Sequence, residues 1–215
     1  MDDVLNFIKS RRSVRKYIDE KITTEEIRKI IDAARYAPSG GNSQPWSFIV
    51  IKDRDKISKI ASICEEKANY IIKKLEGAPH LDEIEDYFRY FYFFRNAPVL
   101  SVVSMKKKKN PVLNYMTSML TQDKTNILDC FDNTNIISVS AAIQNFVLAA
   151  HSMKIGTCIM TGPLIAENEI IDFLSIKKSY RPIALIPMGK FEQREGPAKK
   201  APARKEIDEI LTMIE

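Results

Sequence analysis

Residues 23–51 read TTEEIRKIIDAARYAPSGGNSQPWSFIVI, and this stretch predicts a helix, a loop and a strand in succession. Thr23 followed by Glu26 three residues later is the pattern of a capping box, which marks the start of a helix. The apolar residues that follow recur at the spacing of one helix face, and Pro38 ends the helix. SFIVIK at 47–52 has the length and the branched residues of a buried strand. The predicted helix face consists of Ile27, Ile30, Ile31 and Ala34.

The loop between them, PSGGNSQPW at 38–46, contains no His, Cys, Asp or Glu. It therefore lacks the side chains that usually perform acid–base, nucleophilic or metal chemistry. It is rich in turn formers and small polar groups, and Trp46 is the only tryptophan in the chain. We expect Trp46 to anchor the loop to the core.

The rest of the chain predicts an α+β fold with a small sheet covered by helices. The helix over 136–156 is rich in alanine and is expected to end with Gly156 in the C′ position. The aromatic run in 77–96 indicates a packed or interfacial helix, and 112–134 is amphipathic without a clean period. The predicted helices are 3–11 (with Val4, Leu5, Phe7 and Ile8 buried), 54–76, 136–156, 167–174 and 205–214, and the further strands are 97–105 and 183–189.

Composition limits the class of protein. The chain has 215 residues, of which 45% are hydrophobic, so one domain spanning 1–215 with a sizeable core is expected. A net charge of +5 fits a phosphate-bearing small molecule as well as a nucleic acid. Three cysteines without CxxC spacing favour free buried thiols in a reducing compartment. No apolar run of membrane-spanning length and no signal peptide is present, so a cytoplasmic protein without a membrane partner is expected.

Side chains alone make a poor catalytic set in this chain. The two histidines, His80 and His151, are far apart in sequence, and a structural role is expected for His151. There is no HExxH, GxSxG, GxGxxG or P-loop motif, and no metal site is predicted. Either the protein is not an enzyme, or a cofactor performs the chemistry.

Two basic clusters favour a cofactor with a phosphate. In SRRSVR at 10–15, an extended backbone would place Arg11, Ser13 and Arg15 on one face, which suits an anion. The second cluster is GPAKKAPAR at 196–204, in a loop stiffened by prolines. For the first cluster alone, a solvated basic turn is an equally good interpretation, and the second cluster alone is a weak indication.

Four segments in this order resemble the FMN-dependent nitroreductase family. They are RRSVRKY at 11–17, APSGGNSQPWSFIVI at 37–51, AAIQNFVLAAHSMKIGTCIMTG at 141–162 and MGKFEQREGPAKKAPAR at 188–204, and together they extend over nearly the whole chain. The resemblance implies an α/β/α sandwich with a small, mainly antiparallel central sheet. It also implies an intertwined homodimer with FMN at the interface, contacted by both chains, and no nucleic-acid partner.

The resemblance also implies roles for individual residues. One subunit would contact FMN through its N-terminal basic segment. At least one of Arg11 and Arg15, with Arg15 as the candidate, would stabilise the reduced ring, and the other cations would bind the phosphate. The other subunit would supply the 38–46 loop, and further contacts would come from the long helix and from the turn after it. The implied cofactor-binding residues are Arg11, Arg12, Ser13, Arg15, Pro38, Ser39, Gly40, Asn42, Gln44, Gln144, Thr161, Gly162, Pro163, Lys200 and Arg204.

The implied activity is a ping-pong reaction, in which NADH or NADPH reduces FMN and a small planar acceptor then takes the electrons. A nitroaromatic, a quinone or an enone would suit. The alternatives are different chemistry on the same fold, such as flavin breakdown or reductive dehalogenation, and a non-catalytic flavin-storage or basic binding protein. Many family members carry a second polar or basic residue close to the flavin before the second strand, but FYFFRNAPV at 91–99 is largely aromatic.

Overall fold

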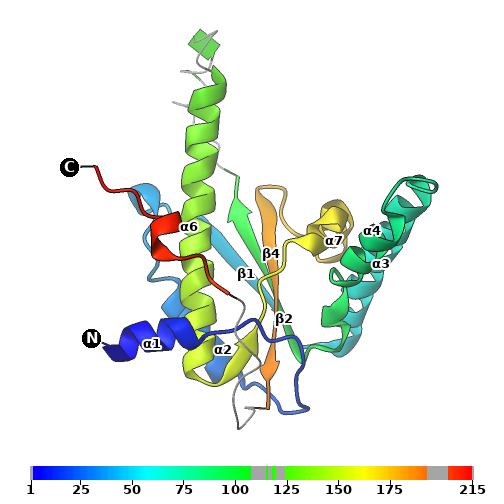
Figure 1. Cartoon of the computed structure of the whole chain (residues 1–215), viewed down its shortest axis with the longest axis horizontal. Helices are drawn as coiled ribbons and strands as arrows, with labels where there is room; N and C mark the ends of the chain where they lie inside the picture. The colour runs from blue at the N-terminus through cyan, green and yellow to red at the C-terminus, as the bar shows by residue number, and fades with distance from the viewer. Residues whose placement is uncertain (1, 108–114, 116–117, 120–123, 193–202, 215) are drawn as a thin grey trace.

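A four-stranded antiparallel sheet with strand order β1-β2-β4-β3 forms the centre of the molecule (Figure 1). The structure is a computed structural model that describes residues 2–107, 115, 118–119, 124–192 and 203–214. The strands are β1 (Trp46–Ile51), β2 (Val99–Lys106), β3 (Ile155–Thr157) and β4 (Tyr180–Lys190). The predicted α+β class is thus confirmed, including the positions of the first, second and last strands.

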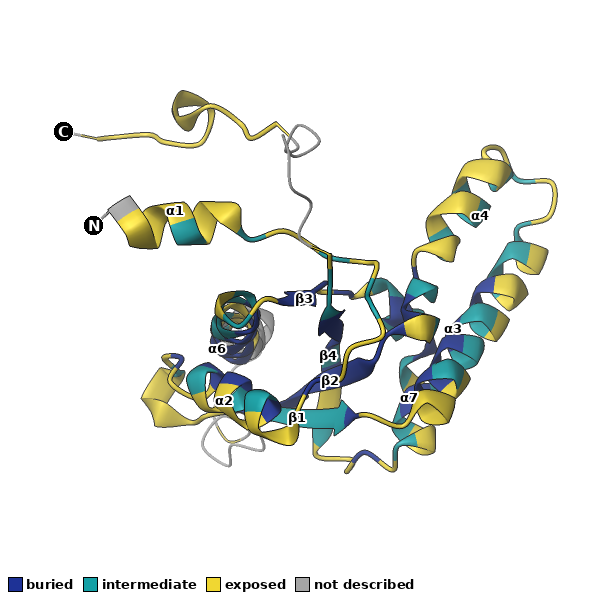
Figure 2. Ribbon diagram, turned by 90° about the horizontal axis from the view of Figure 1, so that it is seen from below, coloured by how far each residue is buried: buried dark blue, intermediate teal, exposed yellow. Residues whose placement is uncertain are grey.

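Helices cover both faces of this sheet (Figure 2). On one face lie α2 (Thr24–Ala34) and α6 (Lys124–Ser152), which pack against each other. On the other lie α3 (Arg54–Lys74) and α7 (Glu167–Phe173), with α4 (Leu81–Arg89) packed outside α3. This arrangement confirms the expected α/β/α sandwich.

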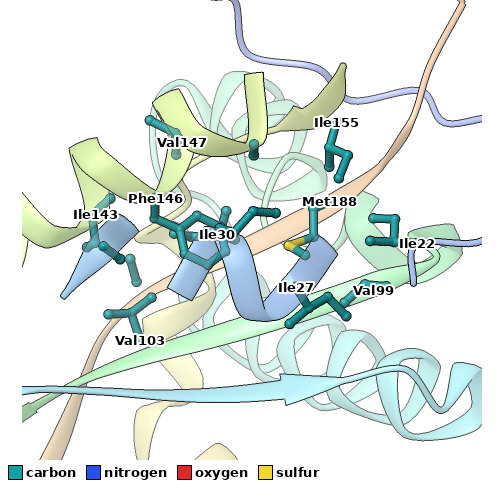
Figure 3. Close-up of a cluster of buried hydrophobic side chains, with 14 of the residues drawn as sticks. Ile22, Ile27, Ile30, Val99, Val103, Ile143, Phe146, Val147, Ile155 and Met188 are labelled. Carbon is teal, nitrogen blue, oxygen red and sulfur yellow. The ribbon is translucent and has the colours of Figure 1, made fainter. Parts of the chain in front are cut away.

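Each face of the sheet has its own hydrophobic core. Phe146 is buried in the core between the sheet, α2 and α6 (Figure 3). Its ring stacks on that of Phe48 of β1, with the two centroids 5.8 Å apart. Cys64 of α3 and Cys158 are buried free thiols in the opposite core, as expected, whereas the side chain of Cys130 lies outside the described residues. β2 lies between β1 and β4 and is buried on both faces, because its alternate side chains enter the two cores. The rigid centre of the fold is therefore this strand and the two cores it separates.

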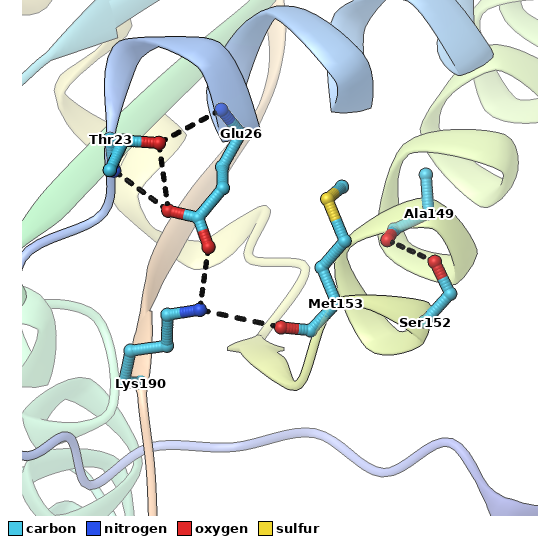
Figure 4. Close-up of polar contacts among 6 residues, drawn as sticks. All are labelled: Thr23, Glu26, Ala149, Ser152, Met153 and Lys190. Atoms are coloured by element: carbon cyan, nitrogen blue, oxygen red, sulfur yellow. Dashed lines mark hydrogen bonds and ion pairs between the residues drawn. The ribbon is translucent and has the colours of Figure 1, made fainter.

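The predicted capping box at the start of α2 is present (Figure 4). The backbone N–H of Glu26 donates to Thr23 Oγ1 at 3.1 Å, and the backbone N–H of Thr23 donates to Glu26 Oε2 at 2.8 Å. Lys190 Nζ lies 2.7 Å from Glu26 Oε1 and also donates to the carbonyl of Met153. The hydrogen bond from Lys190, helped by Thr23, holds the pKa of the Glu26 carboxyl below its usual range. One carboxylate thus ties α2 to the end of β4.

The long helix differs from its prediction at both ends. It starts at Lys124, so it includes part of the segment 112–134; most of the remainder lies outside the described residues. It ends at Ser152, and the left-handed residue after it is Lys154 (φ 55°), not Gly156. The C′ assignment of Gly156 is wrong because this residue belongs to β3, where a Cβ would lie 2.6 Å from Val14 Cβ. Gly156 is required for close packing and not for a turn.

Both chain ends are more exposed than expected. α1 (Asp2–Ser10) forms, but Val4 is 63% exposed and Ile8 46%, so the predicted burial of its apolar face is wrong within one chain. The predicted helix over 205–214 is also wrong, because only a 3₁₀ turn, η4 (Ile207–Glu209), is present. Figure 2 shows α1 and the C-terminal segment projecting from the sandwich on the same side. The exposed apolar residues of the C-terminal segment are Ile207, Ile210, Leu211, Met213 and Ile214.

The aromatic run divides into two parts. α4 ends at Arg89 and a 3₁₀ turn, η2 (Phe93–Asn96), leads into β2. Phe91 and Phe94 are buried, whereas Tyr87 and Tyr90 are 62% and 60% exposed. Tyr92 and Phe93 are partly buried against the core beneath α3, so packing explains most of the run but not Tyr87 and Tyr90. In the described part of the chain, no helix is both long enough and apolar enough to span a bilayer.

Candidate functional site

The basic segment near the N-terminus is an extended arm fixed to the edge of the sheet. We call residues 11–18 the N-terminal arm. The N–H of Val14 donates to the carbonyl of Thr157 at 2.9 Å, and the N–H of Ile18 donates to the carbonyl of Lys190 at 3.0 Å. Ser13 forms a parallel bridge with Thr157 of β3. The extended backbone considered in the sequence analysis is thus present, and the sheet edge supplies its hydrogen-bond partners.

Arg15 of this arm lines a cavity of about 260 Å³ that also includes Thr161, Gly162 and Pro163. The last three residues form the turn into η3 (Gly162–Ala166), whose backbone packs so closely on the ring of Phe91 that a Cβ at Gly162 would overlap it. We call this the aromatic cavity, because one wall comes from α4 and the segment after it. The remaining lining residues are Tyr87, Tyr90, Phe91, Phe93, Cys158, Ile159 and Met160. Four of the residues implied by the family resemblance therefore meet in one place.

A second cavity, of about 210 Å³, lies where the arm leaves α1 and passes the end of α6. Arg11, Arg12, Ser10 and His151 contribute to its lining. Arg12 Nη1 donates to the carbonyls of Lys9 and Arg11, so its guanidinium caps the end of α1. Of the two adjacent arginines, Arg12 is thus held by the chain's own backbone.

His151 has a structural role in this second cavity. Its Nε2 lies 2.8 Å from Ser10 Oγ, and its ring lies 5.0 Å from that of Phe7. Because Ser10 Oγ donates to the carbonyl of Phe7, the imidazole Nε2–H is the donor to Ser10. Burial, then the charges of Arg11 and Arg12, lower the pKa of His151. A neutral imidazole that joins α1 to α6 agrees with the structural role expected from the sequence.

The 38–46 segment, called here the glycine loop, contains the 3₁₀ turn η1 (Gly40–Asn42). Its backbone is left-handed at Gly41 (φ 58°), Asn42 (φ 50°) and Gln44 (φ 43°). Ser39 Oγ accepts from the N–H of Gln44 at 3.1 Å, and Gln44 Nε2 donates to Asn42 Oδ1 at 3.2 Å. Trp46 packs against the α2/α6 core and so anchors the loop, as predicted.

The glycine loop and the aromatic cavity lie on opposite faces of the sheet. Gly40 packs against Thr134 of α6, whereas the aromatic cavity adjoins the core beneath α3. Pro38 is exposed at the start of the glycine loop, and Gln144 is an exposed residue of α6. Arg204 is exposed in the C-terminal segment, and Lys200 lies outside the described residues. Within one chain, therefore, the implied site residues form separate groups.

Sequence reasoning did not identify the cavity residues that come from α4 and the segment after it, or those that follow β3 at 158–160. The signal for them was the aromatic run, which was interpreted as packing. The same run contains Arg95, which donates to Ser62 Oγ at 2.9 Å and forms an ion pair with Glu65. Arg95 is thus directed to α3, and Arg15 is the cation among the residues that line this cavity. Among the described residues, no three His, Cys, Asp or Glu side chains are grouped to hold a metal ion.

Comparison with known proteins identifies the family. The sequence model of the Nitroreductase family matches residues 8–190, which is most of the chain and includes the arm, the loop and the aromatic cavity. The chain belongs to the nitroreductase family. The resemblance noted from the four sequence segments is thus confirmed.

The proteins that resemble this chain carry different functional names. A "Putative NADH dehydrogenase/NAD(P)H nitroreductase" of Methanothermobacter thermautotrophicus is 29% identical over 87% of this chain and 76% of its own length. Iodotyrosine deiodinase 1 of Sus scrofa is 28% identical over 96% of this chain and 67% of its own. The crystal structure of a BluB-like flavoprotein from Clostridium difficile 630 superposes with a TM-score of 0.84 at 32% identity, covering 99% of each chain.

Proposed function

We propose that this chain is an FMN-dependent oxidoreductase that uses NADH or NADPH to reduce a small planar acceptor. The observation that carries the proposal is the aromatic cavity, which joins Arg15 and the Thr161–Pro163 turn to a wall of aromatic side chains. Membership of the nitroreductase family and similarity to a flavoprotein support the choice of cofactor. We infer one catalytic domain per chain, with a cytoplasmic location as a further expectation.

The chemistry of the donor set fits FMN. Arg15 provides a permanent cation beside the η3 backbone, where a flavin ring that gains electrons would need positive charge. The N–H of Gly162 begins a 3₁₀ turn and has no carbonyl of that turn to bind, so it can donate to a ring edge. Arg11 and Ser13, earlier on the arm, supply a guanidinium and a hydroxyl suited to a phosphate. Cations of the C-terminal segment, Arg204 among them, would complete that subsite.

FMN, when bound, supplies the redox chemistry in a ping-pong cycle, receiving two electrons from NADH or NADPH and passing them to the acceptor. The residues of the chain bind and orient both molecules, and no side-chain acid or base is required. The exposed rings of Tyr87 and Tyr90 offer flat apolar surface to a planar acceptor such as a nitroaromatic, a quinone or an enone. Phe91 and Phe93 limit the room for water beside them.

The proposal includes a homodimer in which each flavin is held by both chains. The loop residues and Arg15 lie on opposite faces of the sheet in one chain, so a second copy is the simplest source of the missing half of each site. Exposed apolar side chains on both termini and on α6 support such an association, because burying them removes apolar surface from water. On α6 they include Ile136 (40% exposed) and Ile137 (68%).

Reductive dehalogenation is a second candidate, favoured by the similarity to iodotyrosine deiodinase over 96% of this chain. A halogenated phenol is also planar and aromatic, so the same cavity could accept it. The two candidates share the cofactor and the donor, and they differ only in the acceptor.

A spectrum of the purified protein tests the proposal. We expect a bound-flavin absorption band that bleaches when NADH or NADPH is added anaerobically. Adding menadione, a nitrobenzoate or iodotyrosine should then restore the band, and the rates of restoration rank the acceptors. A colourless protein that acquires no flavin spectrum from added FMN would overturn the proposal. If iodotyrosine restores the band and the other two acceptors do not, reductive dehalogenation is the favoured function.

A further inference from the structure

We propose that Tyr17 is a positioning residue for Arg15: its hydroxyl fixes the N-terminal arm so that the Arg15 guanidinium stays in the aromatic cavity. The proposal rests on the proposed function, since it assigns Arg15 the role of the cation beside the flavin. It adds a residue outside the cavity lining that sets the position of this cation.

The hydroxyl of Tyr17 bridges the arm and the sheet. It lies 2.9 Å from the carbonyl of Val14 and 3.2 Å from the carbonyl of Pro187 in β4. A phenol has one proton, so it is shared between the two carbonyls, with the nearer Val14 the main acceptor. Burial raises the pKa of Tyr17, nearby Cys158 adds to the rise, and the charge of Arg15 opposes it. The hydroxyl therefore remains a donor at neutral pH.

The ring of Tyr17 is fixed as firmly as its hydroxyl. It packs over Gly189 of β4, where a Cβ would lie 2.7 Å from Tyr17 Cδ1 and 2.9 Å from Pro98 Cδ. The next residue, Ile18, donates its N–H to Lys190 at 3.0 Å. A ring seated on glycine backbone has little freedom to move, so the hydroxyl meets Val14 at a fixed point.

Val14 is consequently held on three sides. Its N–H donates to Thr157, its carbonyl accepts from Tyr17, and its side chain packs on Gly156. Arg15 follows directly, and successive side chains of an extended segment point to opposite sides. Holding Val14 therefore sets the direction in which Arg15 leaves the backbone, which is toward the aromatic cavity. Loss of the Tyr17 hydroxyl would free the Val14 carbonyl and let this direction vary.

The test is a double-mutant cycle with Tyr17→Phe and Arg15→Gln, read as the two-electron midpoint potential of bound FMN. Arg15→Gln removes the cation and should lower the potential. Tyr17→Phe keeps the ring and should lower it by a smaller amount, up to a tenfold loss of preference for reduced over oxidised FMN, or about 30 mV. In the double variant, Tyr17→Phe should add no further shift. Tyr180→Phe, on the opposite end of β4, is the matched control and should leave the potential unchanged.

The proposal would be overturned if Tyr17→Phe left the midpoint potential unchanged. It would also be overturned if Tyr17→Phe shifted the potential in the Arg15→Gln background as much as it does in wild type. A readout on the flavin-free protein separates this proposal from the proposed function. Amide exchange at Val14 and Ile18 should be faster in Tyr17→Phe than in wild type, and equal rates would also overturn it. Wild-type protein that binds no FMN would instead refute the proposed function and with it the role of Arg15.

Discussion

The N-terminal arm and the glycine loop, the two segments implied to contact the same flavin, are stabilised in opposite ways. The arm has an ordinary extended backbone, and its order comes from partners elsewhere in the chain: the carbonyls of Thr157 and Lys190, and the carbonyl of Pro187, which accepts from the Tyr17 hydroxyl. The loop has three left-handed residues, and its side-chain hydrogen bonds stay within Ser39, Asn42 and Gln44. The first segment is shaped by the sheet, whereas the second is anchored to the fold at Pro45 and Trp46 and is otherwise shaped by its own turns.

The difference in hydrogen-bond partners indicates which half of the proposed flavin site is already formed within one chain. The arm places Arg15 in a cavity whose lining comes from one chain. The loop is largely exposed and carries the backbone strain that is common where a ligand or a partner will bind. In the proposed dimer, the arm would be the preformed half, and the loop of the other chain would complete it.

The largest effect is expected from Gly156→Val, which breaks the support of the arm. The added side chain would meet Val14 and Phe191, because a Cβ at this position already lies 2.6 Å from Val14 Cβ and 2.9 Å from Phe191 Cδ1. We expect more than a tenfold loss of FMN affinity and a loss of about 1–3 kcal/mol in the free energy of unfolding. Flavin fluorescence titration and denaturant unfolding measure the two quantities. Wild-type FMN affinity in this variant would show that the arm does not contribute to the site.

A smaller effect is expected from Gly41→Ala in the loop. No atom lies within 4 Å of a Cβ at this position, so the cost comes only from the φ of 58° and amounts to about 1 kcal/mol. FMN affinity should fall by less than about tenfold, and amide exchange of the arm should not change. A loss as large as that of Gly156→Val would mean that the loop is as tightly supported as the arm. Gly77→Ala, also at positive φ in open space, controls for the strain alone.

Local patterns were sufficient for most of the fold. The capping box, the apolar period of α2 and the branched strand residues predicted elements whose hydrogen bonds are local or whose burial follows from periodicity. The errors lie where other parts of the chain decide. Gly156 resembles a helix terminator, but its environment is set by Val14, far away in sequence. The C-terminal segment has apolar residues at helical spacing, yet it packs on too little of its own chain to stabilise a helix.

The candidate site shows the same limit. The basic and glycine-rich motifs were recognisable because their residue types are those that the proposed flavin site requires. The contribution of Tyr87 and Tyr90 could not be deduced, because an aromatic run looks the same whether its rings are buried or line a cavity. Tyr90 and Phe91 are neighbours between α4 and η2, yet Tyr90 is 60% exposed and Phe91 only 7%, and no residue type marks this difference.

The central claim is that each site combines the arm of one chain with the loop of another, and mixed dimers test it most directly. Arg15→Gln and Asn42→Ala chains with different affinity tags would be co-expressed, and dimers carrying both tags isolated and titrated with FMN. Each variant alone should bind FMN more weakly than wild type at both sites. A shared site predicts that the mixed dimer regains one site of wild-type affinity, because one arm and one loop are both intact there. Two weakened sites and none of wild-type affinity would contradict the claim.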